Sequence, residues 1–329
     1  MALLRPALLT AAAATLAPLA AAQSIAVSGS STVYPISSAV AEAFAEDTGA
    51  NVKVESVGTG GGFKAFAKGE TDISNASRPI KFKEHQALKE AGIDYVEVPV
   101  AYDGLSIVVN KANSWADKLT VDQLRTIFIE GGATSWNEVD PSFPDVPLKI
   151  YAPGEASGTY DYFKEVVSGK KDKATGKYKY GELRSDMSKS EEDNVLVNGV
   201  AGESGAIGFF GVAYYEANRD KLNAVMIENK QGEYVGPAAE TIEDGTYNPF
   251  SRPLFIYVST KSLQRPEVKN FVDFYLEEGP ELAEEVGYVR LPSSVYDAAE
   301  RRVREHETGS SFMDAEGNAL SGSVVDLYK

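Results

Sequence analysis

Apolar side chains near the start of the chain first alternate and then recur at helical spacing, with small polar residues between the two patterns. Residues 25–27 alternate as in a strand, and apolar residues from 36 to 44 mark one face of a helix. The intervening segment, residues 28–33, consists of serine, glycine and threonine followed by valine. Pro35 lies where the first turn of a helix accepts proline. The pattern predicts a strand, a small-residue turn and a helix.

The same arrangement recurs twice. A second copy runs from residue 51 to residue 69, with the glycine-rich turn 58–62 before its helix, and a third runs from 148 to 167, with the turn 152–159. Strands that alternate with helices predict an α/β fold with a largely parallel sheet.

Further apolar runs complete the expected elements. Residues 95–100 and 105–109 read as two strands separated by a turn at 101–104, and residues 254–258 read as a strand after a proline. Residues 266–306 are largely helical in pattern.

The three turns share a chemistry suited to anions. Ser30–Val33, Gly58–Gly61 and Ser157–Thr159 each combine hydroxyls with glycines or small residues at or near a helix start. Unpaired backbone N–H groups and the positive end of the helix dipole favour an anion there. Parallel strands place such turns at one sheet edge, so the three turns should converge. The alternative is that the hydroxyls only cap the helices.

Composition and charge limit the function. The 329 residues are 43% hydrophobic, enough for a large core divided into two lobes, and the formal net charge is -16. That charge argues against nucleic acid and anionic membranes as partners. It also repels an anionic ligand. Salt screens charges beyond about 8 Å, so hydrogen-bond donors within a cleft determine whether an anion binds there.

The first 22 residues form a separate segment. Arg5 precedes an apolar stretch at 7–19, and three alanines, 20–22, resemble a cleavage site. We interpret this segment as a secretory signal rather than a membrane span or a buried helix. No cysteine occurs, which excludes a disulfide, a thiol nucleophile and a cysteine-linked lipid anchor. We therefore expect a free periplasmic protein.

The sequence contains few residues that could form a catalytic or metal-binding site. The two histidines, His85 and His306, stand among charged residues and are expected on the solvated surface. A Ser-x-x-Lys at 168–171 has no companion motif, and Gly176-Lys177 lacks the upstream glycine of a phosphate-binding loop. The sequence predicts no cofactor, no metal and no enzyme activity.

Five motifs together resemble a known family. In the order of that family, the chain carries SGSSTVYP, VGTGGGF, ASRPIK, AYDGLSIVVN and SGTYDYF. They resemble the motifs of the periplasmic phosphate-binding proteins that deliver phosphate to an ABC-type importer. The resemblance implies a two-lobed α/β fold of the type II class, with two crossover strands and phosphate bound in the cleft. Carried over by motif, the implied phosphate donors are Ser31, Thr32, the Val33 amide, Thr59, Ser77, Ser157, Gly158 and Thr159.

The chain departs from the family pattern at two positions. Many members have an arginine where this chain has Pro153, and an aspartate where it has Arg78. We interpret this as an exchange, in which Arg78 supplies the cation and Asp103, in the expected turn 101–104, supplies the carboxylate. The alternative is that Arg78 and Asp103 form a structural ion pair near the hinge.

The sequence thus predicts a monomeric binding protein that captures inorganic phosphate and passes it to a membrane permease. One lobe should comprise residues 24–100 and 255–329, and the other residues 101–254. A receptor for another tetrahedral oxyanion such as sulfate, or a secreted phosphoester hydrolase, remains the alternative.

Overall fold

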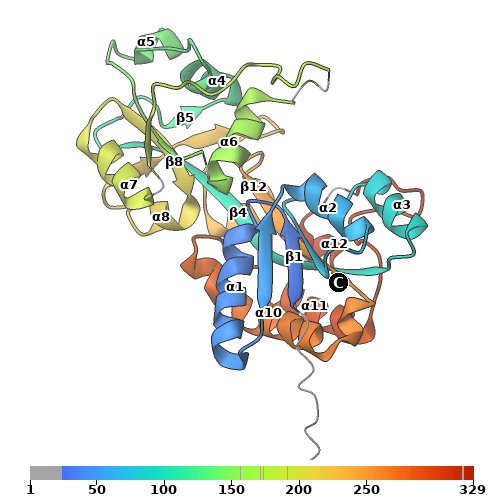
Figure 1. Ribbon diagram of the computed structural model, residues 1–329. Helices are drawn as coiled ribbons and strands as arrows, with labels where there is room; N and C mark the ends of the chain where they lie inside the picture. The colour runs from blue at the N-terminus through green and yellow to red at the C-terminus, as the bar shows by residue number, and fades with distance from the viewer. Residues whose placement is uncertain (1–23, 156, 171, 173, 191, 321) are drawn as a thin grey trace, which may run out of the picture.

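The computed structural model describes residues 24–329 except 156, 171, 173, 191 and 321. The expected signal segment, 1–22, lies outside the described residues. Figure 1 shows two lobes, and the long strands β4 (Tyr95–Asn110) and β12 (Ser251–Ser259) run between them. Among the described residues, no helix is both long and apolar enough to cross a bilayer.

The first lobe contains both ends of the described chain. Its strands are β1 (Ile25–Gly29), β2 (Val52–Ser56) and β3 (Ile73–Ala76). Its helices are α1 (Tyr34–Thr48), α2 (Thr59–Ala67), α3 (Phe82–Glu90), α10 (Pro266–Glu285), α11 (Ser293–Glu305) and α12 (Val324–Leu327), with the 3₁₀ turn η1 (Ser262–Gln264).

The second lobe contains the middle of the chain. Its strands are β5 (Lys118–Leu119), β6 (Lys149–Pro153), β7 (Ser188–Ser190), β8 (Ala206–Gly211), β9 (Leu222–Ala224), β10 (Met226–Glu228) and β11 (Tyr234–Val235). Its helices are α4 (Val121–Phe128), α5 (Trp136–Val139), α6 (Gly158–Ser168), α7 (Asp193–Gly202), α8 (Val212–Glu216) and α9 (Ala239–Glu243).

One sheet passes through both lobes, in the order β2-β1-β3-β12-β4-β8-β6-β7, with β9 also paired to β4. Strands β1, β2 and β3 are parallel, and so are β6, β7 and β8, as the alternation of strands and helices predicts. The crossing strands are antiparallel to their neighbours. The turns after β1, β2, β3 and β6 therefore open toward the region between the lobes.

The predicted apolar faces form the core. Ile36, Val40 and Phe44 of α1 are all buried, and the Phe44 ring packs edge-on against Phe271 of α10 at 5.3 Å. Full burial of such side chains is worth about 1.5 to 3 kcal/mol each. In the second lobe, Phe163 of α6 stacks on Phe209 of β8 at 3.8 Å, which fixes α6 on the sheet.

The predicted turn at 101–104 is wrong. Residues 95–110 form one strand, β4, and every residue of it is buried. Its first half pairs with β12 and its second half, from Leu105, pairs with β8. Gly104 packs closely against α9, since a Cβ there would lie 2.7 Å from Ile242 Cδ1 and that side chain would have to shift. The polar and glycine residues that resemble a turn mark the point where the strand changes partners between lobes.

Glu97 is a fully buried carboxylate in the first half of β4. It accepts hydrogen bonds from the Tyr257 hydroxyl at 2.9 Å, the Ser310 hydroxyl at 2.7 Å and the Ser311 amide at 2.9 Å. Burial raises the pKa of Glu97, and these hydrogen bonds offset only part of that effect. Glu97 thereby ties the segment after α11 to the crossing strand.

We expect Glu97→Gln to alter the pH dependence of stability. A carboxyl whose pKa is higher in the folded protein contributes stability that is complete below its unfolded pKa and is lost as the pH rises through its folded pKa. The variant should be less stable than the wild type by about 1 kcal/mol at low pH, because one acceptor becomes a donor. The difference should shrink as the pH rises. Thermal unfolding of both proteins between pH 4 and pH 8 measures it, and parallel curves would contradict the prediction.

Candidate functional site

The turn after β1 brings hydroxyls to the start of α1 without capping it. Val33 is the N-cap residue, is fully buried and provides no side-chain hydrogen bond. The Ser30 hydroxyl accepts from the Thr32 amide at 3.2 Å, and the Thr32 carbonyl accepts from the Tyr288 hydroxyl at 2.6 Å. The backbone of the turn is thus held in place, and at α1 the simple capping alternative does not hold.

The turn after β2 and the turn after β3 meet each other. Thr59 is the first residue of α2, and its hydroxyl lies 3.2 Å from the Ser77 hydroxyl and accepts from the Ser77 amide at 3.2 Å. Gly58 precedes the helix with a φ of 74°, a conformation that favours glycine. Two predicted donors from separate turns therefore lie side by side, as expected.

Arg78 pairs with Glu84 and Asp103 with Arg252, so the alternative of an ion pair between Arg78 and Asp103 is wrong, and so is the expected proximity of these two residues. The guanidinium of Arg78 donates to both carboxylate oxygens of Glu84 at 2.8 Å and to the Pro79 carbonyl at 3.1 Å. Glu84 lies in the first turn of α3 and reaches back across the helix start, where the Lys81 amide also donates to it. A carboxylate six residues away thus satisfies Arg78 locally.

The cation beside Asp103 is Arg252 of β12, directly opposite it in the sheet. Both Nε and Nη2 of Arg252 lie 3.2 Å from Asp103 Oδ2. The Asp103 side chain is only 3% exposed, and burial raises its pKa while the Arg252 guanidinium lowers it in part. Sequence reasoning missed Arg252, although an arginine directly before Pro253 at the start of a buried strand was a usable signal.

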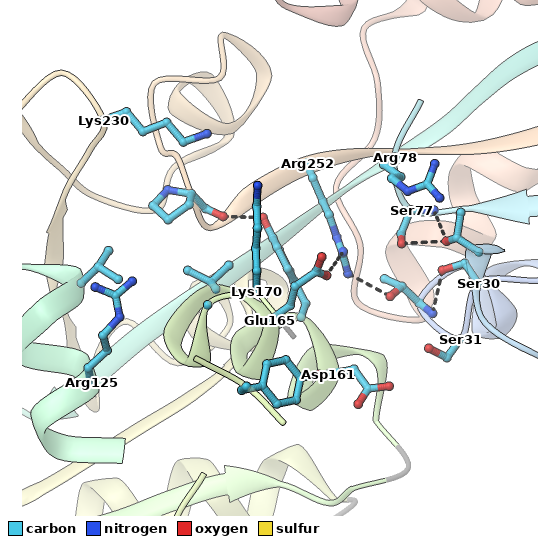
Figure 2. A pocket seen from close by; sticks show the side chains of 18 of the residues that line it. Ser30, Ser31, Ser77, Arg78, Arg125, Asp161, Glu165, Lys170, Lys230 and Arg252 are labelled. Atoms are coloured by element: carbon cyan, nitrogen blue, oxygen red, sulfur yellow. Dashed lines mark hydrogen bonds and ion pairs between the residues drawn. The ribbon is translucent and has the colours of Figure 1, made fainter. Parts of the chain in front are cut away.

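Arg252 also joins the two lobes. Its Nη2 donates to the Thr32 hydroxyl at 2.9 Å, and its guanidinium lies over the ring of Tyr162 in α6 at 3.6 Å. Its Nη1 faces the Glu165 carboxylate of α6 at 3.6 Å. Figure 2 shows the side chain extending between α6 and the turn after β1. A charged group with donors in a planar fork suits an oxyanion.

The turn after β6 contacts the first lobe. Ser157 is the N-cap of α6, and its hydroxyl accepts from the Thr159 amide at 3.1 Å, so here a capping role does hold. Gly158 is buried, and a Cβ added to it would lie 2.7 Å from Thr32 Cα and 3.1 Å from the Thr32 amide nitrogen. The absence of a side chain is what permits this approach between the two turns.

The predicted residues other than Val33 line two cavities, and Ser31 lines both. A cavity of about 1250 Å³ is lined by Ser31, Thr32, Thr59, Ser77 and Arg78, and a smaller one of about 340 Å³ by Ser31, Asp103, Ser157, Gly158 and Thr159. Val33 lines neither of these two. The larger cavity also has a set of cationic residues that the sequence did not single out: Lys81, Arg125, Lys170, Lys230 and Arg252. The same cavity is also lined by carboxylates, those of Asp122, Asp161, Glu165 and Glu228, so charges of both signs face it.

The histidines lie apart from the site. The His85 ring nitrogen Nδ1 lies 2.9 Å from the Tyr95 hydroxyl and is half-buried, so the expectation of a solvated His85 is wrong. His306 is exposed and ends α11. Within the described ranges, no group of three or more His, Cys, Asp and Glu side chains could hold a metal ion.

Comparisons with known proteins agree with this architecture. A family model described as a PBP superfamily domain matches residues 14–278. Protein SphX of Synechococcus elongatus is 47% identical over 305 residues, which are 92% of this chain and 87% of the relative. The phosphate-binding protein PstS of Staphylococcus saprophyticus is 41% identical over 270 residues, 82% of this chain and 80% of the relative.

Solved structures extend the likeness. A possible phosphate-binding protein from Planctomyces limnophilus is 45% identical, with a TM-score of 0.81 over 87% of this chain and 99% of that one. An ABC-type phosphate transport receptor from Vibrio cholerae is 25% identical, with a TM-score of 0.61 over 82% of this chain and all of that one, 100%.

The two-lobed α/β fold is thus that of the type II periplasmic binding proteins, which confirms the predicted fold class. Within that class, the chain belongs to the family of phosphate-binding proteins that includes PstS.

Proposed function

We propose that this protein binds inorganic phosphate between its lobes and delivers it to an ABC-type permease. The observation that carries the proposal is the convergence of hydroxyl-bearing turns from both lobes on Arg252: Thr32 bonds to it directly, and Gly158 packs against Thr32. The relatives named as phosphate-binding proteins support the choice of anion. Proteins of this family act in transport outside the cytoplasmic membrane, and we propose that this chain acts as a periplasmic monomer and not as an enzyme.

The proposed donors keep the predicted set and change its cation. Ser31, Thr32, Thr59, Ser77, Ser157, Gly158, Thr159 and the Val33 amide would contact phosphate through hydroxyls and backbone N–H groups. Arg252 would supply the charge next to Asp103, and Arg78, already paired with Glu84, would line the cleft.

We propose that the lobes divide as expected, at 24–100 with 255–329 and at 101–254. The pairing of β12 supports this division, because its register with β4 shifts between Leu254 and Phe255, and pairing with β3 begins at Phe255. A shift in register at the crossing is a natural place for a hinge to bend.

Calorimetric titration of phosphate, sulfate and arsenate into ligand-stripped protein tests the function. Phosphate should bind in a one-to-one complex and sulfate far more weakly. Tight sulfate binding would favour a receptor for a different oxyanion, and turnover of a generic phosphate ester would favour a hydrolase.

Replacement of Asp103 by asparagine should reduce the preference for phosphate over sulfate by at least about tenfold. Both Arg252 contacts go to Oδ2, so Oδ1 remains as an acceptor for the proton that phosphate carries near neutral pH and sulfate lacks. Asparagine keeps the shape, removes the charge and adds a donor. Affinities for both anions at one pH and ionic strength measure the effect, and an unchanged ratio would assign Asp103 to structure alone.

A further inference from the structure

Helix α6 directs two carboxylates at the larger cavity, whereas its N-terminal turn lines the smaller one. Asp161 and Glu165 are four residues apart, so they lie on one face of the helix, and both line the larger cavity. Figure 2 shows both side chains on the side of α6 that faces Ser31 and Arg252. An anion that enters this cavity meets two negative groups.

Each carboxylate engages a group that the proposed site assigns to phosphate. Glu165 Oε2 lies 3.6 Å from Arg252 Nη1. Asp161 lies near Ser31 in Figure 2, and both residues line the larger cavity. Desolvation in the cleft raises the pKa of Asp161, and Lys164, Ser31 and Arg252 offset only part of that effect. Ser31 comes from the first lobe and Asp161 from the second.

The two carboxylates that pair with Arg252 differ in how easily they can leave. The Asp103 side chain is 3% exposed and lies on a central strand, whereas the Glu165 side chain is 72% exposed. An exposed ion pair is worth little, so Glu165 can turn into solvent at small cost. Asp103 holds Nε and Nη2 of Arg252, so Glu165 acts as the replaceable partner of the remaining Nη1 group.

We propose that Asp161 and Glu165 are internal competitors of phosphate: Glu165 occupies the Arg252 Nη1 group, Asp161 lies beside Ser31 in the same cavity, and the anion displaces both carboxylates. This inference rests on the proposed function. It adds that two carboxylates of the protein itself limit its affinity for phosphate. The competitors lower the cost of releasing phosphate, because Arg252 Nη1 regains a partner as the anion leaves.

Phosphate titrations of Glu165→Gln and Asp161→Asn test the proposal. Each variant should bind phosphate roughly two- to fivefold more tightly than the wild type, in line with the small worth of an exposed ion pair. Glu300→Gln, an exposed change of the same charge on α11, is the control and should leave the affinity unchanged.

A double variant locates the effect at Arg252. In an Arg252→Lys background the forked guanidinium is lost, so the gain from Glu165→Gln should largely disappear. A gain that persists in full would show general repulsion and would overturn competition for Nη1. Weaker binding in Glu165→Gln or Asp161→Asn would also overturn the proposal, because the carboxylates would then hold the lobes together or accept the proton of phosphate. Failure of the wild type to bind phosphate would instead defeat the proposed function.

Discussion

Replacement of Arg252 by glutamine should weaken phosphate binding by about 3 kcal/mol, more than a hundredfold. The side chain is only 16% exposed, lies in the cleft and is bonded to Thr32, so its charge acts on the anion with little screening. Glutamine keeps hydrogen-bonding capacity but removes the charge. Isothermal titration calorimetry at fixed ionic strength measures the loss.

The same change should also destabilise the fold, because Asp103 loses its cation. Breaking a buried ion pair costs about 3 kcal/mol or more, unless the carboxyl takes up a proton. The double variant Arg252→Gln with Asp103→Asn removes both charges and should recover stability without recovering phosphate affinity. Recovery of affinity as well would show that Arg252 only positions Asp103 and does not contact the anion.

Replacement of Gly158 by alanine should weaken phosphate binding by about 2 kcal/mol, roughly thirtyfold, while the fold stays intact. The added methyl group would lie 2.7 Å from Thr32 Cα, and backbone atoms cannot move aside as a flexible side chain would. The clash lies between the lobes, so it opposes closure and leaves each core unchanged. Alanine is also the better helix former at the start of α6.

Small-angle scattering and calorimetry together test this prediction. Wild-type protein should contract when phosphate binds, because the proposed donors come from both lobes, and Gly158→Ala should contract less. Gly202→Ala in α7 is the matched control, since a Cβ there has no atom within 4 Å. Equal affinity and equal contraction in wild type and Gly158→Ala would show that the contact between Gly158 and Thr32 is not part of the bound state.

The partner of Arg78 could have been predicted from the nearby sequence. Its partner Glu84 is six residues away and bonds to the Lys81 amide at the helix start. A glutamate three residues after a helix boundary is a known signal for a side chain that folds back over that boundary. Attention to this spacing would have predicted Glu84, rather than Asp103, as the carboxylate that pairs with Arg78.

The sequence by itself determined the succession of strands, turns and helices and the three turns rich in small residues. Those features follow from spacing and from the conformations that glycine, serine and proline allow, which act over a few residues. It also carried the family motifs, and these led to the fold class and to the predicted donors.

Only the tertiary structure decided which charges meet. Asp103 and Arg252 are 149 residues apart, and they face each other because β12 lies beside β4 in a particular register. The unbroken course of β4 likewise depends on pairing with strands from both lobes, which overrides the turn-like residues 101–104. Strand order and register are set by contacts across the whole fold, so a local pattern could mark Arg252 as a candidate but could not pair it with Asp103.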